Sequence, residues 1–205
     1  IAAVGLEGFE QRAIGALFDQ LTKGGILGGY KRIVVVGLGP VCGHAACAHA
    51  AALPGARVLT TRPAASPAWR DAPFETRFRD ARRLDFSGRF GFAPDGLRAV
   101  TAGVHLFDPL DAPDAAQAAL FRGSPLTRIP LPHGGVYLDA MLGEGPALAR
   151  AILAVAAERP SVASLRAALR PAWRGHLPWL ERRIAALRDA GQDRRAECLV
   201  RIAQG

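Results

Sequence analysis

Residues 33–60 read IVVVGLGPVCGHAACAHAAALPGARVLT. The first four residues are apolar and β-branched, which suits a central strand of a parallel sheet that is buried on both faces. A glycine-containing turn follows at 37–43, an alanine-rich helix is expected at 44–53, and a second strand is expected at 57–60. Strand, turn, helix and strand in this order form a βαβ unit, so the sequence predicts a parallel sheet with helices packed on it.

The rest of the chain continues the alternation of helices and strands. Apolar spacing predicts helices at 8–23, 112–121 and 146–157 and strands at 104–107 and 126–129. Residues 62–96 show no sustained spacing of apolar residues at a helical or strand period. They are expected to form a long connecting segment, the excursion, that contains short helical pieces. Three amphipathic stripes near the end predict a helical C-terminal appendage over 159–205, which leaves an α/β domain over 1–158.

Composition bounds the class of protein. The chain is 50% hydrophobic and 21% charged, so it can bury a core, and no apolar run approaches the roughly 18 residues of a membrane span. Three cysteines are too few for a disulfide framework, which favours a reducing, cytoplasmic compartment. The chain opens at Ile1 without an initiator methionine, so its true start is expected to be missing.

The positive charge has a compositional explanation. The net charge is +8, yet only Lys23 and Lys31 are lysines among 26 basic residues, a bias typical of a GC-rich coding sequence. A nucleic-acid partner is therefore not expected, and neither is a membrane. A small-molecule substrate or a protein partner stays open.

Ligands of open parallel sheets bind beyond the carboxyl ends of the strands. Three segments leave such an end: the turn at 37–43, the loop Asp108-Pro109-Leu110-Asp111, and the loop that contains His133. Turn, acid and histidine is the chain order of an α/β-hydrolase triad. In a triad the carboxylate fixes the tautomer of the imidazole, and the imidazole takes the proton of the nucleophile.

On these residues the chain resembles the α/β-hydrolase superfamily, and within it a group of uncharacterised bacterial proteins. The resemblance runs from Ile33 to His133, about half of the chain, and the segments Asp108-Pro109 and Pro132-His133-Gly134 are its most telling parts. The other resembling stretches are residues 44–56, 73–79, 85–90 and 111–114. The resemblance implies a three-layer α/β-hydrolase-like sheet that lacks its first strands, with esterase or acyl-hydrolase activity on an unknown substrate.

The same resemblance implies a degenerate active site. The family's Gly-x-Ser-x-Gly turn precedes an alanine-rich helix, and aligned without gaps its nucleophilic serine falls on Pro40. Proline has no nucleophilic group and no backbone N–H, so the chain is expected to be catalytically degenerate. If it is active, His133 would be the general base, Asp108 or Asp111 the orienting acid, and Cys42 or an activated water the nucleophile.

The turn also supports an alternative, a Rossmann-type NAD(P)-binding domain. Gly37-x-Gly39-x-x-Cys42 is close to the Gly-x-Gly-x-x-Gly fingerprint, and Gly43 adjoins the third position. The surrounding valines resemble the cofactor loop of medium-chain dehydrogenases. No acidic residue follows the second strand, where Thr60-Thr61-Arg62 would suit a 2′-phosphate. The cofactor-binding residues of this alternative are Gly37, Gly39 and Gly43, whereas the hydrolase interpretation needs no cofactor.

Other polar residues have structural explanations. Four side chains of metal-binding type crowd one short segment, yet no helix lets them converge on one ion, so no metal site is expected. They are Cys42, His44, Cys47 and His49. His105 lies in a predicted strand and is expected to be a packing residue. Asp111 and Asp114 precede an alanine-rich helix, where an N-cap arrangement is an open alternative to catalysis.

Overall fold

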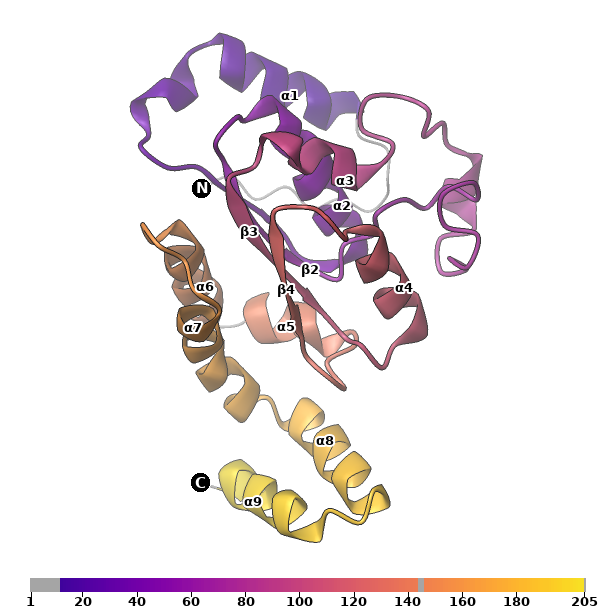
Figure 1. Cartoon of the computed structure of the whole chain (residues 1–205), viewed down its shortest axis with the longest axis vertical. Helices are drawn as coiled ribbons and strands as arrows, with labels where there is room; N and C mark the ends of the chain where they lie inside the picture. The colour runs from indigo at the N-terminus through magenta and orange to yellow at the C-terminus, as the bar shows by residue number, and fades with distance from the viewer. Residues whose placement is uncertain (1–11, 144–145, 205) are drawn as a thin grey trace.

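The computed structural model describes residues 12–143 and 146–204. It contains a parallel sheet of four strands in the order β1-β2-β3-β4, which is also their order along the chain (Figure 1). The strands are β1 (Val34–Gly37), β2 (Arg57–Thr61), β3 (Ala102–Phe107) and β4 (Leu126–Pro130). The α/β class and the parallel sheet predicted from the sequence are confirmed.

Helices connect the strands and continue beyond them. They are α1 (Arg12–Lys23), α2 (Gly39–His49), α3 (Ala93–Gly96), α4 (Ala112–Leu120), α5 (Tyr137–Gly143), α6 (Ala147–Ala156), α7 (Val162–Gly175), α8 (Leu177–Asp189) and α9 (Asp193–Gln204). Short 3₁₀ helices lie at Ile26–Gly29, Ala50–Ala52, Asp80–Arg83 and Leu97–Ala99. The helix expected at 8–23 is α1, and residues 8–11 of that prediction lie outside the described residues.

The βαβ unit closes through small residues. β1 pairs with β2 from Val34↔Arg57 to Gly37↔Thr60. The helix α2 begins at Gly39, earlier than the predicted start at residue 44, because Pro40 stands in its first turn, where no intrahelical N–H bond is needed. A Cβ at Gly43 would lie 2.6 Å from Thr60 Oγ1, so this glycine lets α2 approach β2 closely.

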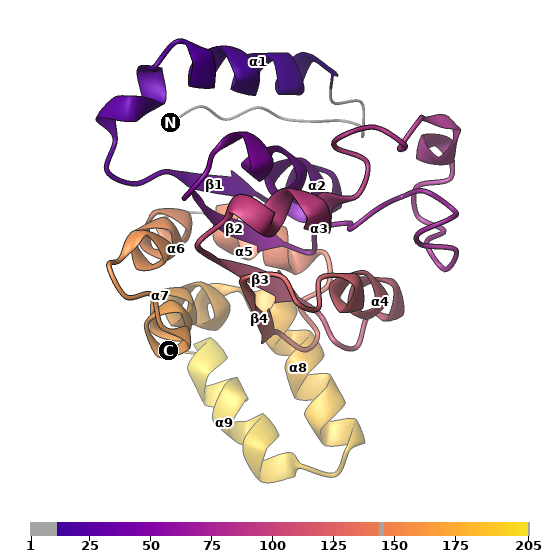
Figure 2. The ribbon, with the colours of Figure 1, turned by 45° about the horizontal axis from the view of Figure 1, so that its top comes forward.

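The sheet is covered on both faces (Figure 2). One hydrophobic cluster joins the strands to α5, α6 and α7, and a second joins them to α2, α3 and the end of α4. The first contains Leu59, Leu106, Ile129, Leu138, Ala151 and Leu165, and the second contains Val58, Leu126, Cys47, Ala93 and Phe121. The neighbours Val58 and Leu59 belong to different clusters because successive strand residues point to opposite faces. The result is a three-layer α/β arrangement.

The structure contains a helix that was not predicted from the sequence. Upstream of it, the predicted strand at 104–107 is β3, and it follows a 3₁₀ helix that ends at Ala99 and a bend at Thr101. The helix α5 was not predicted, because its seven residues, Tyr137–Gly143, make only about two turns and give a short periodic signal.

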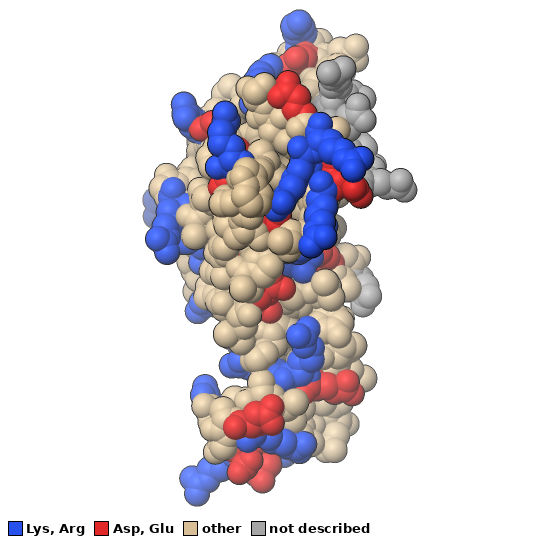
Figure 3. Space-filling model, turned by 90° about the vertical axis from the view of Figure 1, so that its right-hand side faces the viewer, with Lys and Arg blue, Asp and Glu red and all other residues tan. Residues whose placement is uncertain are grey.

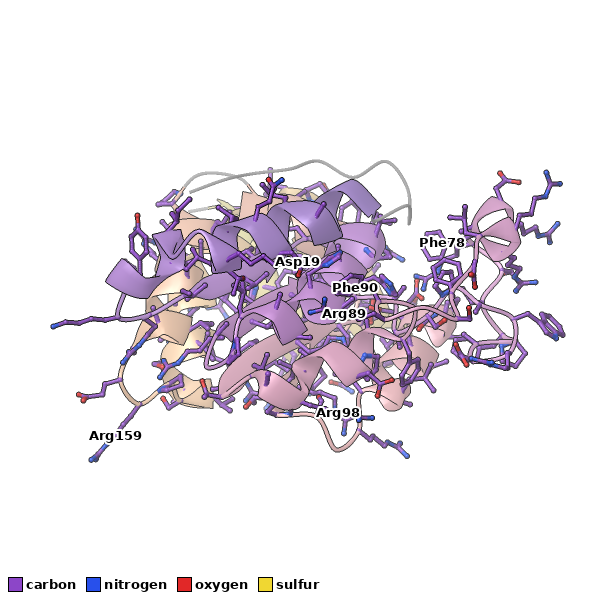
Figure 4. All side chains as sticks on the ribbon, turned by 90° about the horizontal axis from the view of Figure 1, so that it is seen from above. Asp19, Phe78, Arg89, Phe90, Arg98 and Arg159 are labelled. Carbon is purple, nitrogen blue, oxygen red and sulfur yellow. The ribbon has the colours of Figure 1, made fainter. Side chains whose placement is uncertain are left out.

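The excursion between β2 and β3 is anchored by a buried acid. Glu75 is fully buried, and its Oε2 accepts hydrogen bonds from Arg77 Nη2 at 2.6 Å and from Gln117 Nε2 of α4 at 3.0 Å. Further along, the Arg89 guanidinium lies over the Phe90 ring and 3.4 Å from the Asp19 carboxylate of α1 (Figure 4). The excursion is thus tied to α4 and to α1.

The C-terminal helices divide between two clusters. Leu165 and Leu169 of α7 belong to the core over the sheet, whereas α8 and α9 share a small cluster around Ile184 and Leu187. The division of the chain between 158 and 159 stays a prediction. Within the described ranges, no helix has the length and the apolar character to cross a bilayer. On the face shown in Figure 3, acidic side chains lie among the basic ones.

Candidate functional site

The turn at the carboxyl end of β1 is built on Gly39. Among residues 37–43, positive φ belongs to Gly39 alone, at 84°. A sharp strand-to-helix turn holds its nucleophile at such a strained position. The residue with this backbone is therefore Gly39, which adopts it without strain, one residue before Pro40, on which the gapless alignment placed the serine. Neither residue carries a nucleophilic side chain.

A carboxylate faces this turn. A Cβ at Gly39 would lie 3.2 Å from Asp139 Oδ2, so the Asp139 side chain fills the space in front of the turn. Thr61 joins the two, because its Oγ1 accepts the Gly39 N–H at 2.8 Å and donates to Asp139 Oδ1. Arg62 Nη2 lies 3.4 Å from Asp139 Oδ2. Burial raises the pKa of Asp139, against the opposing effects of Arg62 and Thr61.

The position of Asp139 bears on the nucleotide alternative. In a dinucleotide fold the pyrophosphate lies at the N-terminus of the helix that follows the first strand. Here that place holds the Asp139 carboxylate, and the Gly39 N–H is already bound to Thr61. An anion would therefore meet an acidic side chain at this helix end, which argues against a bound dinucleotide.

Asp108 is placed at the end of β3, as predicted, and is almost completely buried. Its Oδ1 accepts the backbone N–H groups of Leu110 at 2.9 Å and of His133 at 3.2 Å. Its Oδ2 accepts the N–H of Gly135 at 2.9 Å. The carboxylate is thus occupied by main-chain donors and ties the loop after β4 to the loop after β3.

The structure brings His133 beside Asp108, but through the backbone and not through the ring. His133 has a left-handed backbone, with φ of 65°, inside the loop that Asp108 holds. No hydrogen bond from the described part of the chain reaches the His133 ring. Burial and the nearby charge of Arg183 lower the pKa of this imidazole, and Asp108 opposes that shift. The predicted acid and base therefore lie together without the contact that would orient the imidazole in a triad.

Cys42 lies in the first turns of α2, away from His133. It lines a cavity formed with α1 and β1. In the sheet of the described residues β1 and β4 are the two edges, about 14 Å apart at a strand spacing of about 4.8 Å, and His133 follows β4. Cys42 faces the outer edge of β1, so the structure does not unite this thiol with the predicted base.

The two acids before α4 have structural bonds. Asp111 is the N-cap of α4, and its Oδ1 accepts the Asp114 N–H at 2.9 Å. Asp114 is fully buried, and its Oδ2 accepts the Asp108 N–H at 2.7 Å. Burial raises the pKa of Asp114 to about 7. The N-cap alternative thus describes Asp111, and Asp114 supports the loop that carries Asp108.

Of the four clustered side chains of metal-binding type, His44, Cys47 and His49 are buried, whereas Cys42 lines the cavity. His44 approaches the carbonyl oxygens of Ala64 and Phe90 at 3.0 and 3.1 Å, and burial lowers its pKa to about 4. His49 stacks on Phe18, and His105 packs edge-on against Phe121. Among the described residues, no three groups of metal-binding type lie together.

Asp139 is the residue that the sequence did not reveal. It is carried by α5, which returns from β4 across the carboxyl ends of the strands to the turn after β1. The apolar spacing of Leu138, Met141 and Leu142, all buried, is the signal that could have identified this helix and its polar face.

The comparisons with known proteins add no relative. A scan against protein-family models found no match, and searches of curated proteins and of solved structures found no similar protein.

Proposed function

We propose that this chain is an α/β-hydrolase-like binding module without esterase activity. Two features support the hydrolase-like part of the proposal. The four strands follow one another in sequence order, and an acid follows β3 while a histidine follows β4. The same order of turn, acid and histidine occurs in the triads of that superfamily.

One observation carries the absence of activity. The turn residue with positive φ is Gly39, and the Asp139 carboxylate lies in front of it. A carbonyl carbon placed at this turn would meet no nucleophile, and the developing oxyanion would meet an acidic group. Because the Asp108 carboxylate is engaged by three backbone N–H groups, it does not orient the His133 ring either.

The test is hydrolysis of p-nitrophenyl acetate and p-nitrophenyl butyrate by the full chain. The rate of hydrolysis should not exceed that caused by an unrelated protein without a catalytic site. It should be the same in His133→Ala and in Cys42→Ala. Turnover that is lost in either variant, while its thermal melting curve is preserved, would show a catalytic site and overturn the proposal.

A thermal melting experiment with NADPH tests the nucleotide alternative. Millimolar NADPH should leave the melting temperature unchanged, because Asp139 lies at the helix end where the pyrophosphate would bind. A rise in melting temperature that disappears in Arg62→Gln would replace the proposed module by a dinucleotide-binding domain.

A further inference from the structure

The outer edge of β1 carries backbone groups that face away from the sheet. The Arg57 N–H donates to the Ile33 carbonyl at 2.9 Å, and Val34 pairs with Arg57 in the register. In a parallel ladder the bonds to one neighbour come from alternate residues, so Val35 and Gly37 face β2 while Val34 and Val36 face outward. No backbone hydrogen bond from another described residue reaches the outward groups of Val34 or Val36.

This edge forms one wall of an apolar cavity. The cavity has a volume of about 240 Å³, and its lining is almost entirely aliphatic. Four side chains of α1 face it at helical spacing, namely Ile14, Leu17, Phe18 and Leu21. Cys42, Ala45 and Ala46 of α2 form the wall behind the strand.

One side of the helix α1 is held by contacts with other elements, and its other side lies over the cavity. Asp19 pairs with Arg89, and Phe18 stacks on His49, so one flank of α1 is held by the excursion and by α2 (Figure 4). The apolar stripe beside that flank lines the cavity together with Val34, Val35 and Val36 of β1, and Leu17 is 39% exposed. Among the described residues no further strand pairs with β1 at this edge, so α1 lies beside an unpaired strand.

From this juxtaposition we infer that the outer edge of β1 is the docking site of an extended apolar peptide strand supplied by a protein partner. A strand offers N–H and C=O groups at the repeat that Val34 and Val36 present, and its alternate side chains would fill the space beneath α1. A hydrocarbon ligand would fill the cavity but would leave both pairs of backbone groups unbonded. The inference concerns another surface than the carboxyl edge, so it does not depend on the proposed function.

A second copy of this chain does not fit as the partner. A partner strand beneath α1 must be uncovered on the face against which α1 would pack. In a second copy of this chain, both edge strands are already covered on the corresponding face. Val35 of β1 packs into the cluster of α2, and Leu126 of β4 packs with Phe121 at the end of α4. A strand that is not already part of such a sheet is required.

The other edge of the sheet shows the contrast. The Leu131 N–H donates to the Phe107 carbonyl, so Leu126, Arg128 and Pro130 of β4 face outward. Proline and an exposed charged residue are devices that keep an edge strand from pairing. Val34–Gly37 carries neither, and Lys31 lies exposed just before it. The partner strand is therefore expected to carry an acidic residue at one end.

The probe is the peptide acetyl-Glu-Ile-Thr-Val-Thr-Ile-Glu-amide, which has one apolar face and an acid at each end. Binding to the full chain in its Cys198→Ser form is followed by calorimetry and by the rate at which a thiol reagent modifies Cys42, since Cys42 lines the cavity and Cys47 is buried. The peptide should bind and slow the modification of Cys42. Two further versions of the peptide are N-methylated, each on a different set of alternate residues. Only the version in which the methylated nitrogens are those that would face β1 should lose binding.

The variant Val34→Pro removes one outward N–H at the first position of the strand, where proline is tolerated. It should weaken binding at least about tenfold, whereas Arg128→Pro, the matched change at the outer edge of β4, should leave it within about twofold. Melting curves confirm that both variants fold. Val34→Ala is a further control, because it shortens the side chain but keeps the backbone N–H. Absence of binding at millimolar peptide, equal binding of both N-methylated versions, or protection of Cys42 by decanoate but not by the peptide would each overturn the inference.

Discussion

The carboxylate of Asp108 accepts the backbone N–H of Gly135 at 2.9 Å, across the loop that carries His133. A side chain that in a triad would orient an imidazole here holds a main-chain loop in place. Its role is therefore structural, and it can be tested by stability measurements without a substrate.

Asp108→Asn should lower the free energy of unfolding by about 2 kcal/mol, because an amide NH₂ replaces one oxygen that accepts a main-chain N–H and the charge is lost. Asp111→Asn is the matched control, since asparagine is as good an N-cap as aspartate, and it should change stability by less than about 0.5 kcal/mol. Urea titrations of the two variants measure both values. Equal losses would show that Asp108 does not hold the loop through its second oxygen.

Gly39→Ala should destabilise the protein by more than Gly55→Ala. Both glycines have positive φ, at 84° and 80°, which costs an alanine roughly 1–2 kcal/mol. Nothing lies within 4 Å of a Cβ at Gly55, whereas a Cβ at Gly39 lies 3.2 Å from Asp139 Oδ2. The extra loss should be about 1 kcal/mol and should vanish in an Asp139→Ala background. If it persists there, Asp139 is not the group that closes the turn.

Asp114 should give stability a pH dependence. Burial raises its folded pKa from 3.8 to about 7, so between these values the folded state holds a proton that the unfolded state has released. The free energy of unfolding then falls as pH rises through this window, with a slope of up to about 1.4 kcal/mol per pH unit. Arg62, Arg77 and Asp111 act on this carboxyl group as well.

Asp114→Asn imitates the protonated side chain and should remove that fall. His44 and His105 act in the opposite direction, because burial lowers their pKa values to about 4 and about 3, and stability is then lost as pH falls below about 6.5. The informative quantity is therefore the difference in unfolding free energy between wild type and Asp114→Asn at pH 5 and pH 8. A difference that does not change with pH would mean that Asp114 stays ionised in the folded protein.

Glu75→Gln should cost about 2 kcal/mol, because it leaves the Arg77 guanidinium without its buried counter-charge. Asp95→Asn breaks the exposed pair with Arg98 and should cost less than about 0.5 kcal/mol. Thermal melts compare the two variants, and protease digestion should cut the excursion faster in Glu75→Gln. Comparable small losses would indicate that Glu75 does not anchor the excursion.

The sequence was sufficient for the layered fold where the pattern is strong. The run of valines before Gly37 and the apolar residues after Arg57 define β1 and β2, and small residues between them require a close helix. The helix α5 was missed, because its roughly two turns leave the spacing of Leu138, Met141 and Leu142 as a short signal. Asp139 was hidden with it.

The sequence predicted the candidate site only in part. Asp108 and His133 were found because the carboxyl ends of neighbouring strands meet at one edge. Which hydrogens the Asp108 carboxylate accepts depends on the path of the loop after β4, and no local pattern of residues encodes that path. The same limit explains why the sequence did not identify Gly39 as the turn residue with positive φ, since only the dihedral angles show it.

The pairing of Gly39 with Asp139 also constrains how this protein could evolve. A serine at position 39 would acquire its hydroxyl in a left-handed backbone and directly against a carboxylate that is 28% exposed. A serine at this position is therefore expected to cost stability. Removing the Asp139 carboxylate first would relieve that contact, but it would also leave Thr61 and Arg62 without this partner. A hydroxyl gained at this turn is thus tied to the loss of polar contacts that now hold the turn.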